Sequence, residues 1–235
     1  MFPLRDQLPT RNFPIVNYVL IVLNILMFFV ELTVGLENEQ FFREYALIPS
    51  NVTNGVGIDD AFDFLTSMFM HAGLAHIAGN MLYLWIFGDN VEDALGHIRY
   101  LFFYLAGGVA AAITHIVFDP NSTIPTVGAS GAIAAALGAY LILYPQSKVQ
   151  TIVPVGRAAS VTLVPAIFVL GLWFVLQLFQ GIASLGVDEE VGGVAVWAHI
   201  GGFVFGLALA KLLAKPRSEY GGANFDTGVQ RPRLA

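Results

Sequence analysis

Six apolar segments divide this chain of 235 residues, and they restrict its fold more than any other feature. Hydrophobic residues make up 56% of the sequence and charged residues only 12%, which is about half the charged fraction of a soluble globular protein. A helix needs about 20 apolar residues to cross a hydrocarbon core about 30 Å thick. The sequence therefore predicts an all-α, polytopic membrane protein. The six predicted transmembrane helices are roughly 14–35, 74–88, 100–118, 127–144, 162–182 and 194–213.

The basic residues predict the orientation of these spans. Of the eleven lysines and arginines, only Arg43 is expected on the side opposite to both termini. The positive-inside rule then makes the N and C termini cytoplasmic. The first apolar segment is long and lacks a small-residue cleavage site, so we expect an anchor rather than a signal peptide. We expect residues 14–214 to form one membrane domain, between a cytoplasmic segment 1–13 and a cytoplasmic tail 215–235 whose composition predicts disorder.

The composition also excludes several kinds of site. The chain has no cysteine, which removes disulfides, thiolate catalysis and cysteine-based metal sites. No basic run suggests a nucleic-acid partner. His71, His76 and His115 are all expected near the outer ends of the spans, but without cysteine or a nearby intramembrane carboxylate they form a thin metal-ligand set. We therefore expect neither metal nor cofactor, and we interpret His71 and His115 as structural.

Three of the spans carry polar residues, which are costly in a membrane and usually functional. These residues lie in His76–Asn80, Gly128–Gly131 and Ala198–Gly202. In the predicted topology all three spans run from outside to inside. At about 1.5 Å rise per residue, Ser130, His199 and His76 lie roughly 21, 18 and 20 Å above the inner face. The shared depth, roughly 10 Å below the outer surface, predicts one common site.

Small residues follow the serine and the histidine along their helices. Ser130, Ala134 and Gly138 are spaced i, i+4, i+8, and His199, Gly202 and Gly206 are spaced i, i+3, i+7. Such stripes let membrane helices approach closely. If these two stripes pack together, the serine and the histidine meet within hydrogen-bond reach. Small residues can also serve helix packing alone, but the polar residue at the head of each stripe favours a site. We expect Gly128 and Gly131 to support the same packing.

The residue types match the chemistry of a serine hydrolase. A serine hydroxyl becomes a strong nucleophile when a base takes its proton, and neutral histidine is suited to that task. No carboxylate is expected at a matching depth: Glu31 lies near the outer end of the first span, and Asp89, Glu92 and Asp93 lie about 20 Å away at the inner end. The sequence therefore predicts a Ser130–His199 dyad rather than a triad.

The same site needs donors for a developing oxyanion. His76 and Asn80 are spaced i, i+4 and so share one helix face. Together with the backbone N–H of Ser130, their side chains are the predicted oxyanion hole.

On these residues, the chain resembles a rhomboid intramembrane serine protease of the six-helix bacterial type, over roughly residues 14–214. The motifs are His76-x-x-x-Asn80, Gly128-x-Ser130-Gly131 and Ala198-His199-x-x-Gly202-x-x-x-Gly206, with Gly88–Gly96 similar to the family pattern that closes the second helix. The resemblance implies a rhomboid-like bundle in which Ser130 is the nucleophile, His199 the general base, and His76, Asn80 and the Ser130 amide the oxyanion hole. It also implies cleavage of other proteins' transmembrane segments near the outer membrane boundary, without metal or cofactor.

The chain departs from the family pattern at one position. Some bacterial members have an aromatic residue four positions after the serine, stacked on the catalytic histidine. This chain has Ala134 there. Another group must therefore orient His199, and the sequence does not identify it.

We thus expect an intramembrane serine endopeptidase in the bacterial plasma membrane, with its site open to the extracytoplasmic side. Its partners would be transmembrane protein substrates and the lipid bilayer. The fifth span and the outer loops, including Gly192-Gly193, are candidates for a substrate gate. Residues 41–49 are expected to lie in the membrane interface as an amphipathic loop, with an ordinary covering loop as the alternative. Two alternatives remain: a small transporter, which should show internal repeats or polar groups through the full depth, and a non-catalytic client-binding or quality-control protein on the same fold.

Overall fold

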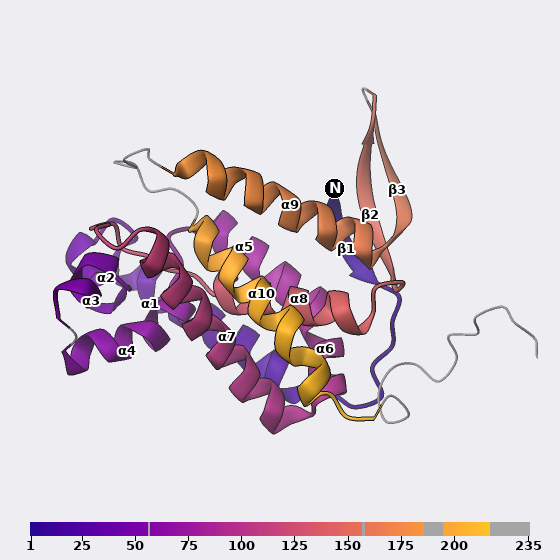
Figure 1. Cartoon of the computed structure of the whole chain (residues 1–235), viewed down its shortest axis with the longest axis horizontal. Helices are drawn as coiled ribbons and strands as arrows, with labels where there is room; N and C mark the ends of the chain where they lie inside the picture. The colour runs from indigo at the N-terminus through magenta and orange to yellow at the C-terminus, as the bar shows by residue number, and fades with distance from the viewer. Residues whose placement is uncertain (56, 157, 186–194, 217–235) are drawn as a thin grey trace, which may run out of the picture.

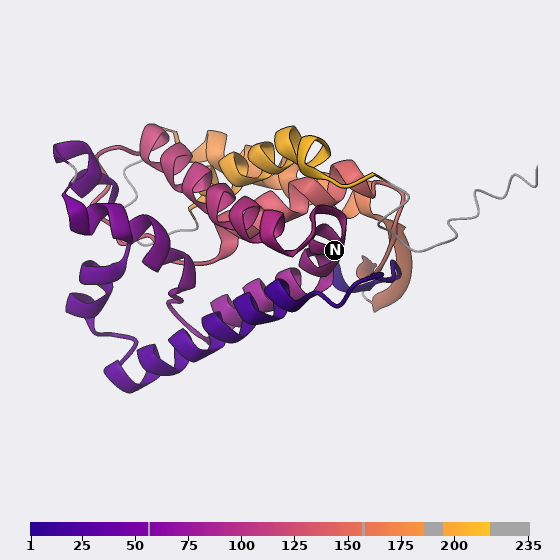
Figure 2. The same ribbon diagram turned by 90° about the horizontal axis from the view of Figure 1, so that it is seen from below.

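The computed structural model describes residues 1–55, 57–156, 158–185 and 195–216, and these form a helical bundle with a small sheet at one end (Figures 1 and 2). The predominantly helical fold is confirmed. Gly192-Gly193 and residues 217–235 of the tail lie outside the described residues. The helices are α1 (Ile15–Val34), α2 (Glu39–Tyr45), α3 (Pro49–Asn54), α4 (Ile58–Thr66), η1 (Ser67–Phe69), α5 (Leu74–Tyr83), η2 (Leu84–Gly88), α6 (Asp89–Leu95), α7 (His97–Phe118), α8 (Ser130–Leu143), α9 (Ala166–Ser184) and α10 (Val196–Leu213). The strands are β1 (Phe2–Asp6), β2 (Lys148–Val155) and β3 (Ala158–Pro165).

Among the described residues, four helices are long and apolar enough to cross a membrane: α1, α7, α9 and α10. The other two predicted spans correspond to α8, which is shorter, and to the uninterrupted run of α5, η2 and α6. That run continues to Leu95, beyond the predicted end of the second span at residue 88. The predicted start of the fifth span at residue 162 is wrong, because Thr162 pairs with Thr151 in the sheet and the helix begins at Ala166.

The centre of the bundle is α8, which packs against α7 and α10 (Figure 1). Eleven of its fourteen residues are buried, and most of these are alanine or glycine. Protein therefore covers this helix on nearly all sides. A short helix is tolerated at membrane depth when protein rather than lipid surrounds it.

Glycines on α8 and α10 bring these two helices into backbone contact. A Cβ atom at Gly202 would overlap the carbonyl oxygen of Gly131, and one at Gly206 would overlap the carbonyl oxygen of Ala135. Gly138 on α8 lies in the same way against the backbone of Phe203. The two stripes of small residues thus face each other, which is the close approach that small side chains permit.

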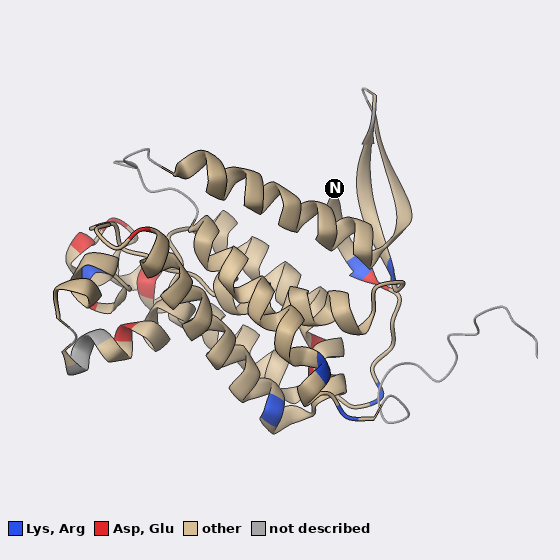
Figure 3. Cartoon of the chain, in the orientation of Figure 1, with Lys and Arg blue, Asp and Glu red and all other residues tan. Residues whose placement is uncertain are grey.

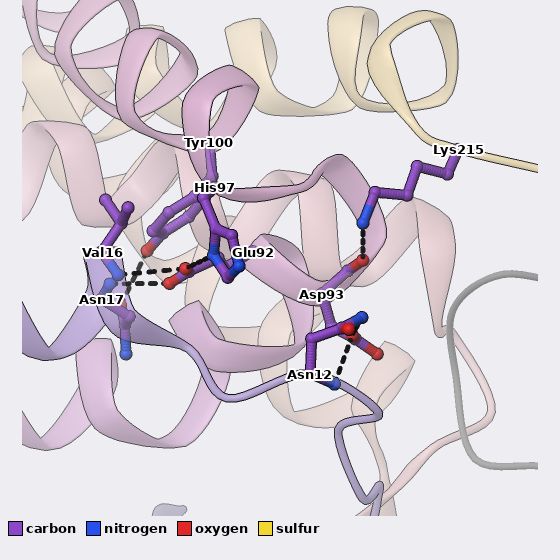
Figure 4. Close-up of polar contacts among 8 residues, drawn as sticks. All are labelled: Asn12, Val16, Asn17, Glu92, Asp93, His97, Tyr100 and Lys215. Atoms are coloured by element: carbon purple, nitrogen blue, oxygen red, sulfur yellow. Dashed lines mark hydrogen bonds and ion pairs between the residues drawn. The ribbon is translucent and has the colours of Figure 1, made fainter.

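The N-terminus of α1 is held by a buried carboxylate on α6. The N–H groups of Val16 and Asn17 donate to Glu92 over 3.0 and 2.7 Å, and His97 contacts the same carboxylate (Figure 4). The first N–H groups of a helix have no intrahelical acceptor, and negative charge is favourable at this end of the helix dipole. Glu92 therefore fixes the start of α1 to α6, the helix that follows the second predicted span.

The next residue, Asp93, ties two further segments to this place. Its side chain accepts hydrogen bonds from the backbone N–H groups of Arg11 and Asn12 over 3.1 and 3.0 Å. Lys215, which follows α10, donates to the backbone carbonyl of Asp93 (Figure 4). The segments that precede α1 and follow α10 therefore meet at α6.

The three strands form an antiparallel sheet in the order β1-β2-β3, which the sequence interpretation missed. The β2–β3 hairpin extends away from the bundle beside the start of α9 (Figure 1). At the end of β1, the carboxylate of Asp6 accepts hydrogen bonds from the hydroxyl of Tyr140 (2.7 Å) and from Nδ2 of Asn90 (3.0 Å). The sheet is thereby attached to α6 and α8.

The basic residues are unevenly distributed along the bundle, whereas acidic residues lie at both ends (Figure 3). Lysines and arginines lie mainly at the end that carries β1 and the turn between α6 and α7, whereas Arg43 lies at the other end, among the acidic residues of α2 to α4 (Figure 3). We refer to these ends as the inner end and the outer end.

Part of the segment between α1 and α5, which was expected to lie in the membrane interface, packs on protein instead. Phe42, Leu47 and Ile48 are buried, while Tyr45 is 39% exposed. Leu47 also pairs with Thr126 in an isolated β-bridge. The interfacial prediction for residues 41–49 is therefore wrong for its second half, where the alternative holds: this half covers the loop before α8.

We predict that Asp6 makes the stability of the protein depend on pH. Burial raises the pKa of the Asp6 carboxyl from 3.8 to about 6, partly offset by the hydrogen bond from Tyr140. Between these two values the unfolded chain ionises and the folded chain does not. Asp6 should therefore contribute a fall of about 2 kcal/mol in the free energy of unfolding as pH rises from 4 through 6.

Thermal unfolding in detergent across this pH range measures the effect. The fall should be smaller in Asp6→Asn by the Asp6 contribution of about 2 kcal/mol, and unchanged in Glu39→Gln, which alters an exposed carboxylate. The same pH dependence in wild type and Asp6→Asn would contradict the assignment.

We predict that Gly202→Val separates α8 from α10. Its side chain would overlap the Gly131 carbonyl, whereas a Cβ at Gly171 on α9 meets nothing within 4 Å. Overpacking of this kind costs about 3 kcal/mol, so Gly202→Val should unfold at clearly lower temperature than the matched control Gly171→Val. Equal melting temperatures for the two variants would show that the contact is not needed.

Candidate active site

Ser130 is the first residue of α8, and the loop before it is held on both sides. Leu47 and Thr126 exchange two backbone hydrogen bonds, of 3.1 and 2.8 Å, and the N–H of Gly128 donates to the carbonyl of Ser67 over 2.8 Å. Gly128 has φ +127°, a conformation that favours glycine. This anchored loop fixes where α8 starts and so where the serine lies.

Gly128 also lets a histidine approach the loop. A Cβ atom added there would lie 2.8 Å from Nε2 of His76. His76 is on α5, and its ring packs edge-on against that of His71, with the ring centroids 5.1 Å apart. The absence of a side chain at Gly128 therefore leaves room for the His76 ring beside Ser130.

The serine and the predicted base are in hydrogen-bond contact. Nε2 of His199, on the first turn of α10, is 2.8 Å from Oγ of Ser130. The glycine contacts between α8 and α10 lie directly below this pair. A serine hydroxyl donating to a neutral imidazole is the arrangement of a nucleophile and its general base.

The other ring nitrogen of His199 meets a residue that the sequence interpretation missed. Nδ1 is 2.7 Å from Oε1 of Gln177, which lies on α9. The ring of Trp173, one turn earlier on α9, has its centroid 5.7 Å from that of His199. A signal for Gln177 was present, because a glutamine within an apolar run is costly in a membrane and usually functional.

His76, Asn80, Ser130 and His199 all line one cavity of about 770 Å³. Asn80 lies one turn after His76 on α5 and is buried, and its Nδ2 has no hydrogen-bond partner. A buried amide donor without a partner is costly. It is therefore available to a ligand in the cavity.

Other polar residues near the outer end support neighbouring segments or line the cavity. Glu31 accepts a hydrogen bond of 2.9 Å from the backbone N–H of His71 and so supports the segment before α5. His115 and Asp119 line the cavity from the outer end of α7. Among the described residues, the hydrogen-bond partners of the His199 ring are Ser130 and Gln177, and neither is a carboxylate.

Comparison with known proteins agrees with this architecture. The Rhomboid domain family matches residues 59–216. Rhomboid protease GluP of Bacillus subtilis (strain 168) is 31% identical over 206 residues, which are 87% of this chain and 36% of that protein. RHOMBOID-like protein 6, mitochondrial, of Arabidopsis thaliana is 29% identical over 161 residues (68% of this chain, 46% of that protein). The human Presenilin-associated rhomboid-like protein, mitochondrial, is 30% identical over 151 residues (61% of this chain, 35% of that protein).

The chain spans about a third to a half of the length of these relatives. The family match, however, covers most of the helical bundle, including every residue of the Ser130–His199 cavity. Together with the apolar helices, it shows that this chain is a multi-pass integral membrane protein that belongs to the rhomboid family.

Proposed function

We propose that this protein is an intramembrane serine endopeptidase that hydrolyses peptide bonds in or near the transmembrane segments of other membrane proteins. The observation that carries the proposal is the 2.8 Å contact between Ser130 Oγ and His199 Nε2 at the wall of a cavity of about 770 Å³. Membership of a family that includes a protein named as a protease supports it. A non-catalytic client-binding protein would not need a serine hydroxyl paired with an imidazole.

The reaction follows from this pair. Ser130 Oγ attacks the peptide carbonyl carbon while His199 Nε2 takes the hydroxyl proton. The imidazolium then gives that proton to the leaving amine, which leaves an acyl-enzyme ester on Ser130. Water in the cavity repeats the attack on the ester, with His199 again as the base, and releases the new carboxyl end.

The negative charge that develops on the carbonyl oxygen needs donors nearby. The backbone N–H of Ser130 lies in the first turn of α8, where amides have no intrahelical acceptor. The unpartnered Nδ2 of Asn80 and the imidazole of His76 line the same cavity. We assign these three groups to the oxyanion hole.

The arrangement in the membrane belongs to the same proposal. Residues 14–214 would form one six-span domain, with the basic inner end in the cytoplasm and the cavity opening toward the outer end, where residues 122–127 border it. Water would enter from that side. Because the match to the Bacillus subtilis protein covers 87% of the chain, we place the protein in a bacterial plasma membrane.

Substrate entry is proposed beside α9. Trp173 and Gln177 of this helix lie against His199, while Phe168, Phe179 and Ile182 on the same helix are each more than 60% exposed. One face of α9 thus borders the site and another faces away from the bundle. Displacement of this helix would open the cavity toward the lipid.

We predict that Ser130→Ala abolishes cleavage of a single-span reporter protein in proteoliposomes, because the nucleophile is removed. Expression and melting temperature should not change. A fluorophosphonate probe should label the wild-type protein at Ser130 and leave the variant unlabelled. Ser160→Ala, at an exposed position of β3, is the matched control and should behave as wild type.

Two results would overturn the proposal. One is cleavage by Ser130→Ala at the wild-type rate. The other is a wild-type protein that binds the reporter but neither cleaves it nor reacts with the probe, which would support the client-binding alternative.

We predict that Asn80→Ala lowers kcat by about 100-fold, since loss of one oxyanion donor typically costs that much. KM should stay within about twofold, because the hydrogen bond strengthens in the transition state. Steady-state cleavage of the same reporter measures both constants, with the exposed Asn51→Ala as control. A rise in KM of about 100-fold with unchanged kcat would instead assign Asn80 to substrate binding.

A further inference from the structure

We propose that Gln177 is the positioning residue of His199: its amide oxygen accepts the Nδ1–H and so keeps Nε2 free to receive the proton of Ser130. This inference rests on the proposed roles of Ser130 and His199. It means that α9 orients the general base of the dyad, in addition to its proposed role in substrate entry.

The geometry around the ring requires one tautomer. The two nitrogens of the imidazole have contacts of 2.7 Å to Gln177 and 2.8 Å to Ser130. An amide oxygen can only accept, so Nδ1 must carry the hydrogen, and Nε2 must then be the acceptor of the serine hydroxyl. This is the tautomer that a general base for Ser130 needs.

A second glutamine supports this orientation of the Gln177 amide. Nε2 of Gln177 donates to Oε1 of Gln180, one turn further along α9, over 3.3 Å. If the amide were turned over, its NH₂ group would donate to Nδ1, Nε2 would carry the hydrogen, and the Ser130 hydroxyl would lose its acceptor. The hydrogen bonds therefore run in one direction, from Ser130 to His199, to Gln177 and to Gln180.

Burial makes this contact effective. Gln177 and His199 are only 8% and 9% exposed, so little water competes for the Nδ1–H. Ala134 has no ring to stack on the imidazole, and Trp173 contacts it from α9 instead. Both groups that hold the histidine in place thus come from α9, whereas Ser130 and His199 come from α8 and α10.

A neutral acceptor suits this depth. A carboxylate in the same position would place a charge in a low-dielectric environment, which is costly. Glutamine orients the ring and selects the tautomer without that cost, but it stabilises the imidazolium less than an aspartate or glutamate would.

The test compares three variants with the wild type. Gln177→Leu removes the acceptor at similar volume, Gln177→Glu keeps an acceptor oxygen, and Phe102→Leu changes a residue of α7 that is 67% exposed. For Gln177→Leu we expect kcat to fall by about 10- to 100-fold, as for partners that fix the tautomer of a metal-bound histidine, with KM within about twofold. Gln177→Glu should recover most of this loss, and Phe102→Leu should match the wild type.

The pH profile of kcat adds a readout that a packing role would not change. In Gln177→Glu the carboxylate stabilises the protonated ring, so the acidic limb should shift to higher pH by about one unit. Other titratable side chains that line the cavity are His76 and Tyr83 from α5, His115 from α7, and Asp119, which directly follows α7. They are present in every variant, so the difference between profiles reports on position 177.

The ring itself can be observed by ¹⁵N NMR of histidine-labelled protein, with His199→Ala used to assign the signals. In the wild type, Nδ1 should have the shift of a protonated nitrogen and Nε2 that of an unprotonated one. In Gln177→Leu the two shifts should move toward each other as the tautomers mix. This readout does not depend on activity.

Failure of the inference is distinct from failure of the proposed function. A Gln177→Leu protein with wild-type kcat, pH profile and ¹⁵N shifts would overturn the inference alone. Equal loss of activity in Gln177→Leu and Gln177→Glu, with an unchanged acidic limb and unchanged ¹⁵N shifts, would also overturn it and reduce Gln177 to a packing residue. Absence of cleavage and labelling in the wild type would overturn the proposed function, while the ¹⁵N comparison would still test the hydrogen bond.

Discussion

The contact between the backbones of α8 and α10 is the constraint on which the rest of the structure depends. Gly202 and Gly206 lie against the carbonyl groups of Gly131 and Ala135, so the two helix axes come closer than larger side chains would allow. At the outer end of this contact Ser130 and His199 reach hydrogen-bond distance. The cavity, the proposed oxyanion hole and the position of α9 are all arranged around that pair.

Much of this arrangement could be inferred from residue spacing. The spacing of Ser130 and Gly138, and of His199 and Gly206, indicates which faces of two helices can meet, because helical geometry fixes the face once the positions are known. Counting residues along each span likewise predicted a common depth. The small sheet was not predictable in this way: Thr162 to Pro165 are mostly apolar and continue directly into α9, so hydropathy alone does not separate strand from helix. Gln177 was missed because its role depends on which face of α9 lies against α10, and neither helix shows a clear apolar side.

The site is built almost entirely from uncharged groups. The serine hydroxyl, the imidazole, the amide of Asn80 and the amide of Gln177 can all be buried at lower cost than a carboxylate. The carboxylates of Glu92 and Asp93 lie instead at the inner end, where backbone amides donate hydrogen bonds to them. The chain thus pairs these buried carboxylates with backbone amides at and before the start of α1, and uses neutral hydrogen bonds around Ser130.

The capping of α1 by Glu92 has a consequence for how the protein is assembled during synthesis. The amides of Val16 and Asn17 are made 76 and 75 residues before their acceptor. Until α6 has emerged, these amides can be satisfied only by water at the membrane surface. The cap that joins α1 to α6 therefore forms only after the second predicted span is complete.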